Sequence, residues 1–396
     1  MVTICMKLQV MQRLNTISWI LARTFGFALP LILIYYISEE TLKDYFLLFQ
    51  VIQVLGLILS AGFTSLIIDL DRAQNWLSMM KSNFKIFIIQ IIFLLFACWI
   101  IWIEVKGYFV FYFIGAILFA FRLFSQTLLR KYYEETRVII ATEITYSFIL
   151  LSLLLSDFLP EISIIAALLV NFAILSLMCR STLIATSVAN ENIKMRPFLK
   201  RTLVFGTQST ALPILVLVYL LSVKPDDIIE VKLAFMSCTG IVWLQSSIKS
   251  YYLRMEHATF SDAILTYRLR IILIFTITIM LYIAMAIGMF FGYELVFNKV
   301  DLGILLFLSL SVFFGNVVIF STVLALRNSQ WKLYAGVSSG KLASVMVVTV
   351  MAAIVTVNHF ADLWAISISY ALYCSLTSAS MFRLARNMAA TKSIVN

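Results

Sequence analysis

Four ionisable residues lie inside long apolar stretches of the sequence, where a charge is expensive and usually marks a functional site. They are Arg23, Arg122, Glu143 and Lys249. Arginine and lysine bind phosphate and carboxylate groups, and the planar guanidinium does so through two parallel hydrogen bonds. A carboxyl group in apolar surroundings can take up a proton or bind a sodium ion. The set predicts an anion site with one acidic side chain nearby.

Each of these charges also has a structural interpretation. Arg122 and Lys249 are expected near the cytoplasmic ends of their helices, Arg122 about five residues from its end, so their side chains can reach the lipid headgroups. Arg23 is expected roughly 10 Å into its helix, at 1.5 Å per residue, which favours a binding role. Glu143 is too short to reach the headgroups. It either pairs with Arg122 or serves as an ion-coupling site, and both interpretations stay open.

Several amide side chains add to this set. Gln245 and Lys249 are four residues apart and share a helix face. Gln208, Asn171 and Asn316 also lie in apolar stretches. Such amides can bind sugar hydroxyls or phosphate, or they can hydrogen-bond neighbouring helices. The predicted substrate-binding residues are Arg23, Arg122, Lys249, Gln208 and Gln245, with Glu143 in ion coupling or an ion pair.

Chemistry that needs a metal or nucleotide is not indicated. The chain has two histidines and five scattered cysteines, without a ligand-spaced cluster. It lacks a glycine-rich phosphate loop followed by Lys-Ser/Thr. No catalytic residues, metal or cofactor are therefore predicted. A proton or sodium gradient is the energy source that remains.

The composition shows which solvent surrounds these residues. Of 396 residues, 62% are hydrophobic and 13% are charged. Soluble proteins are roughly 45–50% apolar and about 25% charged, and a chain of this length cannot enclose the excess. This excludes a soluble enzyme, a disordered chain, a coiled coil and a secreted disulfide scaffold. The sequence predicts an all-α polytopic membrane protein.

Apolar runs of spanning length, about 20 residues each, divide the chain evenly. The twelve predicted transmembrane helices are 16–37, 45–68, 84–103, 107–127, 138–156, 161–180, 203–223, 233–253, 270–291, 302–326, 337–357 and 362–382. With this assignment, most of the 30 Lys and Arg residues fall on the side of the chain ends. The other side carries Lys43, Lys106, Lys224, Lys232 and Lys299. The asymmetry places both termini in the cytoplasm and explains the net charge of +10 without nucleic acid.

The longest connection, about 181–202, is polar and basic and separates two halves. The halves share a weak sequence echo, in which Ala-Leu-Pro follows Phe-Gly in the first and seventh predicted helices, around Pro30 and Pro213. Six helices per half would relate the repeats by an axis along the membrane normal. We therefore predict two six-helix bundles, 1–190 and 191–396, related by pseudo-twofold symmetry.

These features together resemble the polysaccharide repeat-unit flippases, the O-antigen transporter branch of the multidrug/oligosaccharidyl-lipid/polysaccharide (MOP) exporter superfamily. The resemblance rests on the length, the twelve spans, the basic central loop, and two short sequences: Arg-Thr-Phe-Gly at 23–26 and Leu-Ser-Ala-Gly-Phe-Thr at 59–64. Related lipid II flippases have two more helices and a cationic cavity with an arginine in the first helix. Arg23 is similar to that residue.

The resemblance implies a function. Such proteins move undecaprenyl-pyrophosphate-linked oligosaccharide from the cytoplasmic to the periplasmic leaflet of the bacterial inner membrane by alternating access. The implied partners are this lipid-linked oligosaccharide, membrane lipids, and a polysaccharide polymerase and chain-length regulator. Family members often carry more intramembrane charge in the second bundle than Lys249.

Two alternatives remain from the sequence. A cation-coupled multidrug exporter of the same fold would need intramembrane acids, and Glu143 is the clear one against Arg23 and Arg122. A membrane-embedded glycan polymerase or ligase would need a large periplasmic loop with basic catalytic residues. The predicted external loops are short, so an enzyme is not expected.

Overall fold

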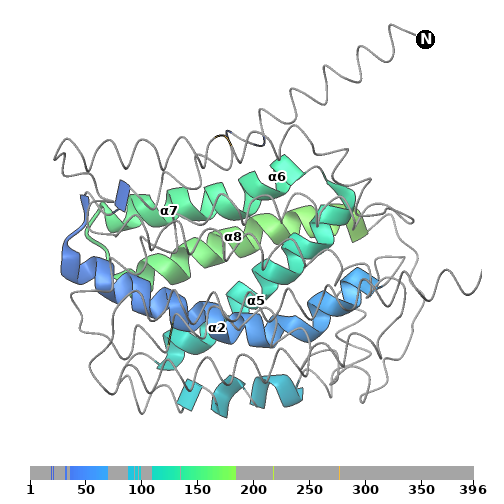
Figure 1. The fold of residues 1–396 in the computed structure, drawn as a ribbon, viewed down its shortest axis with the longest axis horizontal. Helices are drawn as coiled ribbons and strands as arrows, with labels where there is room; N and C mark the ends of the chain where they lie inside the picture. The colour runs from blue at the N-terminus through green and yellow to red at the C-terminus, as the bar shows by residue number, and fades with distance from the viewer. Residues whose placement is uncertain are drawn as a thin grey trace, which may run out of the picture.

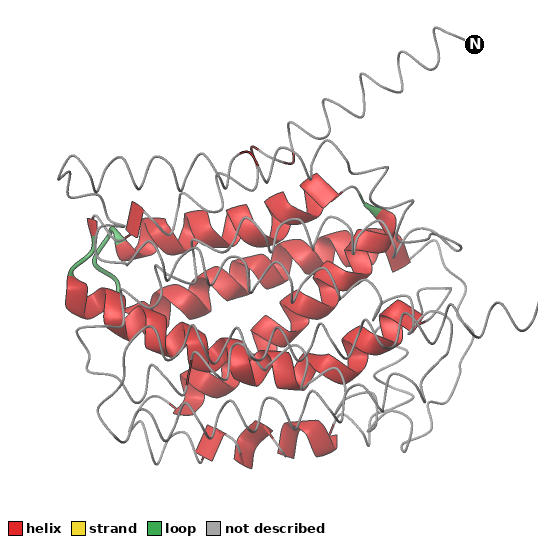
Figure 2. Ribbon diagram, viewed as in Figure 1, coloured by secondary structure: helices red, strands yellow, loops and turns green. Residues whose placement is uncertain are grey.

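The computed structural model describes residues 36–69, 109–133 and 135–183, together with residues 19, 21, 32, 33, 88–92, 94–96, 98, 99, 217 and 276. Within these residues the regular elements are helices, and there is no strand (Figure 2). Four helices are long and apolar enough to cross a membrane: Glu40–Ser60, Phe109–Arg130, Thr136–Leu154 and Pro160–Cys179. The prediction of a helical, multi-pass membrane protein is confirmed for this part. The count of twelve helices and the two symmetric bundles involve residues outside it and stay predictions.

Helix α2 (Glu39–Asp69) begins earlier than the sequence indicated. We expected a helix from residue 45, with Glu39 and Glu40 before it. Instead, Ser38 caps the helix: its hydroxyl accepts a hydrogen bond from the backbone N–H of Thr41 at 3.3 Å. The cap satisfies one of the free N–H groups of the first turn. The two acidic residues therefore lie in the first turn of α2, where the helix dipole favours negative charge.

Helix α5 (Phe109–Tyr132) continues past its predicted end near residue 127. Its apolar span reaches Arg130. Arg122 is thus eight residues from the end of the span, about 12 Å at 1.5 Å per residue, rather than about five residues. This correction places Arg122 close to the middle of the span.

The next span is a helix in three parts: α6 (Glu135–Ile139), the π-helical segment η1 (Ile140–Ile144) and α7 (Thr145–Leu154). The sequence predicted one regular helix over 138–156. A π-helical turn shifts the backbone hydrogen bonds by one residue, and such turns often occur at functional sites. The hydroxyl of Thr145 donates to the carbonyl of Ile140 at 2.8 Å, which satisfies a backbone acceptor in this segment.

A tight turn joins α7 to helix α8 (Pro160–Leu183). The N–H of Phe158 bonds the carbonyl of Leu153 at 3.2 Å, and the N–H of Asp157 bonds that of Leu154 at 3.2 Å. This is a Schellman motif with Asp157 in the left-handed conformation at φ 57°. Pro160 then opens α8 at the first position, where a missing N–H is tolerated.

The long helices pack in the order α7, α8, α5, α2 across the described part (Figure 1). The α2–α5 contact is closest at two glycines. A Cβ atom on Gly56 would lie 2.8 Å from Cδ1 of Phe119 and 3.0 Å from the carbonyl oxygen of Ala116. A Cβ on Gly115 would lie 2.6 Å from Cδ1 of Ile52. Small residues at helix crossings bring backbones together where lipid gives no hydrophobic drive.

Candidate functional site

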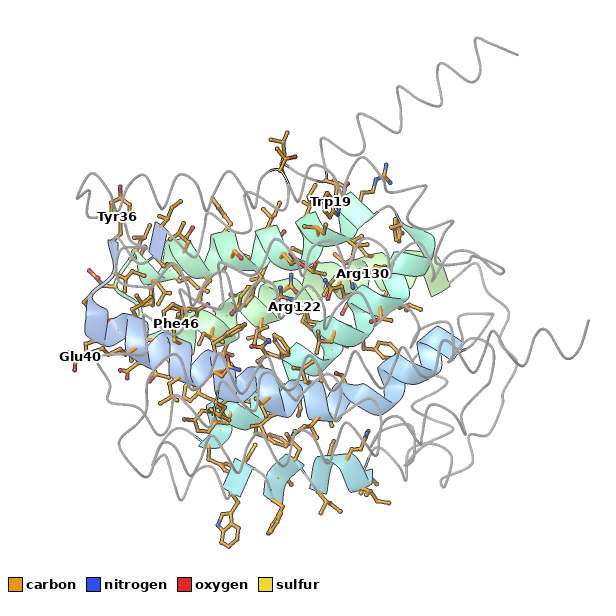
Figure 3. The ribbon with its side chains drawn as sticks, in the orientation of Figure 1. Trp19, Tyr36, Glu40, Phe46, Arg122 and Arg130 are labelled. Carbon is orange, nitrogen blue, oxygen red and sulfur yellow. The ribbon has the colours of Figure 1, made fainter. Side chains whose placement is uncertain are left out.

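The guanidinium of Arg122 lies on aromatic rings inside the helical layer (Figure 3). Its Cζ is 4.5 Å from the ring centroid of Tyr146 and 5.8 Å from that of Phe119. The Arg122 side chain is partly exposed although it stands near the middle of its span. Its sequence position four residues before Gln126 places both side chains on one face of α5.

Gln126 links α5 to the π-helical segment. Its Nε2 donates to Oε1 of Glu143 at 3.3 Å and approaches Oγ1 of Thr142 at 3.5 Å. Thr142 in turn donates to the carbonyl of Val138 at 2.7 Å. The carboxyl group of Glu143 thus has a neutral hydrogen-bond partner on the neighbouring helix, one turn from Arg122.

Asn171 of α8 supports the same segment from the other side. This residue is fully buried, and its Nδ2 donates to the carbonyl of Ala141 at 2.6 Å and to that of Thr142 at 3.3 Å. In a π-helical segment the backbone bonds run one residue further than in an α-helix, and Asn171 gives two carbonyls of this segment a side-chain donor. Asn171 therefore makes the interhelical hydrogen bonds that were one of its two predicted roles.

An aromatic cluster from three helices surrounds the guanidinium. Phe49 of α2 contacts Tyr45, Phe119 and Tyr146, with ring centroids 5.9, 5.8 and 6.0 Å away. Tyr45 and Tyr146 are 6% and 4% exposed. The phenol groups of both tyrosines and the carboxyl group of Glu143 interact electrostatically with Arg122.

The two phenol groups also interact with each other through their hydroxyls, although not in the geometry of a regular hydrogen bond. The hydroxyl of Tyr146 makes no hydrogen bond of 3.5 Å or less within the part of the chain that is described.

The structure brings two of the predicted site residues, Arg122 and Glu143, onto facing segments. Arg23, Lys249, Gln208 and Gln245 lie outside the described residues. Sequence reasoning missed Gln126, Tyr146 and Tyr45. The first two had a detectable signal, because Gln126 follows Arg122 by four residues and Tyr146 follows Glu143 by three, so each pair shares a helix face.

Comparison with known proteins agrees with the helical architecture. No family model and no curated protein sequence matches the chain. Solved structures do match across nearly its full length. A MOP-superfamily transporter from Pyrococcus furiosus matches with a TM-score of 0.58 and 16% identity, over 96% of this chain and 95% of that chain. An outward-facing multidrug resistance MATE family transporter of the same superfamily matches with a TM-score of 0.57 and 15% identity, over 96% and 95%. The chain therefore has the fold of the MOP-superfamily transporters.

Proposed function

We propose that the protein moves an undecaprenyl-pyrophosphate-linked oligosaccharide, such as an O-antigen or similar polysaccharide repeat unit, from the cytoplasmic to the periplasmic leaflet. The observation that carries the proposal is the guanidinium of Arg122, deep in a membrane-spanning helix. It lies over the rings of Tyr146 and Phe119. Ring faces do not occupy N–H donors, so these remain available to the paired oxygens of a pyrophosphate group.

An arginine at the centre of a membrane helix costs roughly 2.5–3.5 kcal/mol on insertion scales. A desolvated cation–π contact contributes about 2 kcal/mol. The rings of Tyr146 and Phe119 and the carboxyl group of Glu143 offset this cost in part, and an anionic ligand would stabilise the guanidinium further.

The fold supports a transporter rather than a glycan polymerase or ligase. Binding pockets within this fold differ in polarity. The Pyrococcus furiosus neighbour has a binding pocket of reversed polarity, which suggests a different function for that protein. An arginine-centred site for an anionic cargo is in keeping with that variation.

The rest of the proposal comes from the sequence. Arg23, Lys249, Gln208 and Gln245 would complete the site for pyrophosphate and sugar. The bundles 1–190 and 191–396 would alternate around it, driven by a proton or sodium gradient through Glu143. The protein would lie in the bacterial inner membrane with both termini in the cytoplasm, beside a polysaccharide polymerase and a chain-length regulator.

The test is translocation of a labelled undecaprenyl-pyrophosphate oligosaccharide by the full-length protein in liposomes, read as loss of the label's accessibility to an external glycosidase. Arg122→Ala should reduce the rate at least tenfold, and Arg122→Lys should restore only part of it because lysine lacks the planar fork. Arg137→Ala is the matched control, since Arg137 is an exposed arginine on the next span. We expect it to transport normally.

Wild-type rates in Arg122→Ala, with normal amounts of protein in the liposomes, would contradict the proposal. So would a wild-type protein that leaves the oligosaccharide in its original leaflet under an imposed proton or sodium gradient.

A second candidate is a cation-coupled multidrug exporter of the same fold. The observation in its favour is the carboxyl group of Glu143, held by Gln126 beside an aromatic cluster, since aromatic faces attract organic cations. Gradient-driven uptake of tetraphenylphosphonium into the same liposomes, abolished by Glu143→Gln and retained in Arg122→Ala, would favour this candidate.

A further inference from the structure

Tyr146 carries a buried hydroxyl group without a hydrogen-bond partner. The side chain is 4% exposed, and its Oη makes no hydrogen bond within the described part of the chain. Leaving such a group unpaired is unfavourable, and most buried polar atoms in proteins are paired. An unpaired hydroxyl beside a membrane-embedded guanidinium therefore points to a ligand that supplies the missing acceptor.

The polar neighbours of Tyr146 have other partners. The carboxyl group of Glu143 accepts from Gln126 at 3.3 Å. The amide nitrogen of Asn171 is bound to the carbonyls of Ala141 and Thr142. These bonds fix the segment that leads into Tyr146 and hold its ring against Arg122. The hydroxyl and the guanidinium thus form two adjacent donor groups in one aromatic enclosure.

We propose that Tyr146 and Arg122 form a single oxyanion site, in which the tyrosine ring orients the guanidinium and the tyrosine hydroxyl donates a hydrogen bond to a phosphate oxygen held by the arginine. The ligand class is a phosphate or pyrophosphate group, free or esterified. Its identification with a lipid headgroup rests on the proposed function, whereas the anion site itself does not.

Tyr45 offers a competing explanation. Its hydroxyl interacts with that of Tyr146, outside the geometry of a regular hydrogen bond, so a small rotation could complete a hydrogen bond between the two hydroxyls and leave none for a ligand. In that case, Tyr45→Phe and Tyr146→Phe should lower thermal stability equally, and neither should change ligand affinity. Ligand affinity therefore separates the binding role from the structural one.

The experiment measures dissociation constants of the purified full-length protein in nanodiscs for two probes, inorganic pyrophosphate and farnesyl pyrophosphate. The variants are Tyr146→Phe, which keeps the ring, Tyr146→Leu, which removes it, and Tyr45→Phe. Tyr112→Phe is the matched control, because Tyr112 is also a buried tyrosine, at 3% exposure, ten residues before Arg122. Melting temperature and size-exclusion profile report folding.

We expect Tyr146→Phe to weaken both probes by about 10- to 100-fold, the range for one hydrogen bond to a charged group. Tyr146→Leu should weaken them further because the guanidinium loses its platform. Tyr112→Phe should bind like the wild type. If Tyr146→Leu does not fold, Tyr146→Phe alone decides the proposal, since it changes one oxygen atom.

Other outcomes overturn one proposal or both. Equal affinities for Tyr146→Phe and wild type, with loss of binding in Arg122→Ala, would overturn the role of Tyr146 and leave the flippase function standing. A wild type that binds inorganic pyrophosphate alone, weakened by Tyr146→Phe, would support the anion site and overturn the lipid cargo. A wild type that binds neither probe would overturn both.

Discussion

Besides its packing on α8, helix α5 makes two contrasting kinds of contact. Toward α2 the backbones approach until Gly56 leaves no room for a side chain between it and Phe119. Toward η1 and α7, long side chains reach across: Arg122 to Tyr146 and Gln126 to Glu143. The first contact depends on the absence of side chains, and the second depends on their length.

The difference indicates which contact can change during a transport cycle. Close backbone packing has one good arrangement, because dense interiors resist deformation. Polar side chains that bridge a wider gap can exchange one partner for another, including a ligand. We therefore expect substitutions at the glycine contact to alter stability, and substitutions at the polar contact to alter transport.

The largest expected effect comes from the pair Arg122 and Glu143. If Arg122 and Glu143 acted as a buried ion pair, removing one member would cost about 3–5 kcal/mol, and removing both would restore much of that loss. However, the side chain of α5 that hydrogen-bonds Glu143 is Gln126, and glutamine at position 143 can keep that bond. We therefore expect Glu143→Gln to keep normal membrane abundance while transport falls at least tenfold under either gradient.

The double variant Glu143→Gln/Arg122→Ala completes the comparison. Low abundance of each single variant, restored in the double one on immunoblots of isolated membranes, would show that the residues serve as a structural pair. Wild-type transport by Glu143→Gln would remove Glu143 from both mechanisms.

The next effect concerns the glycine contact. Gly56→Ala should lower stability by about 1–3 kcal/mol through overpacking, because the added Cβ would meet a ring atom at 2.8 Å and the backbone oxygen of Ala116 at 3.0 Å. Gly115→Ala should be milder, since its Cβ would meet Cδ1 of Ile52 at 2.6 Å and Cγ1 at 2.9 Å, which belong to a side chain and not to the backbone. Thermal unfolding in detergent measures both. A loss of transport without a loss of stability in Gly56→Ala would break the proposed contrast between the two contacts. Equal losses of stability in the two variants would show that the backbone oxygen of Ala116 is not the decisive obstacle.

The smallest effect is expected at Asn171. Asn171→Leu removes the donor to two carbonyls of the π-helical segment but also removes an unpaired buried oxygen. The net loss should be about 1 kcal/mol, with a clear decrease in transport because η1 positions Glu143 and Tyr146. Ser152→Ala is the control, since that exposed hydroxyl bonds within its own helix, to Phe148. A variant with normal transport would show that the π-helical segment needs no support from α8.

Much of the helical framework could be predicted from the sequence, because apolar runs of spanning length allow few structures in a membrane. The helix ends were predicted less well. The start of α2 depends on the local hydrogen bond of the Ser38 cap. The continuation of α5 to Tyr132 depends on basic residues that a helix tolerates at its end. The facing of Arg122 and Glu143 was suggested by their charges. The π-helical segment was not predictable, since the local sequence does not show that Asn171 on another helix bonds the carbonyls of Ala141 and Thr142.

The turn at Asp157 has a consequence for biosynthesis. Only residues 155–159 separate α7 from α8, so the two helices can enter the bilayer together as a hairpin. The hydrogen bonds of Asn171 to Ala141 and Thr142 lie within that hairpin. The amide nitrogen of Asn171 and the two carbonyls can therefore be paired before they enter the hydrocarbon. Neither helix then has to carry these polar groups into the bilayer alone.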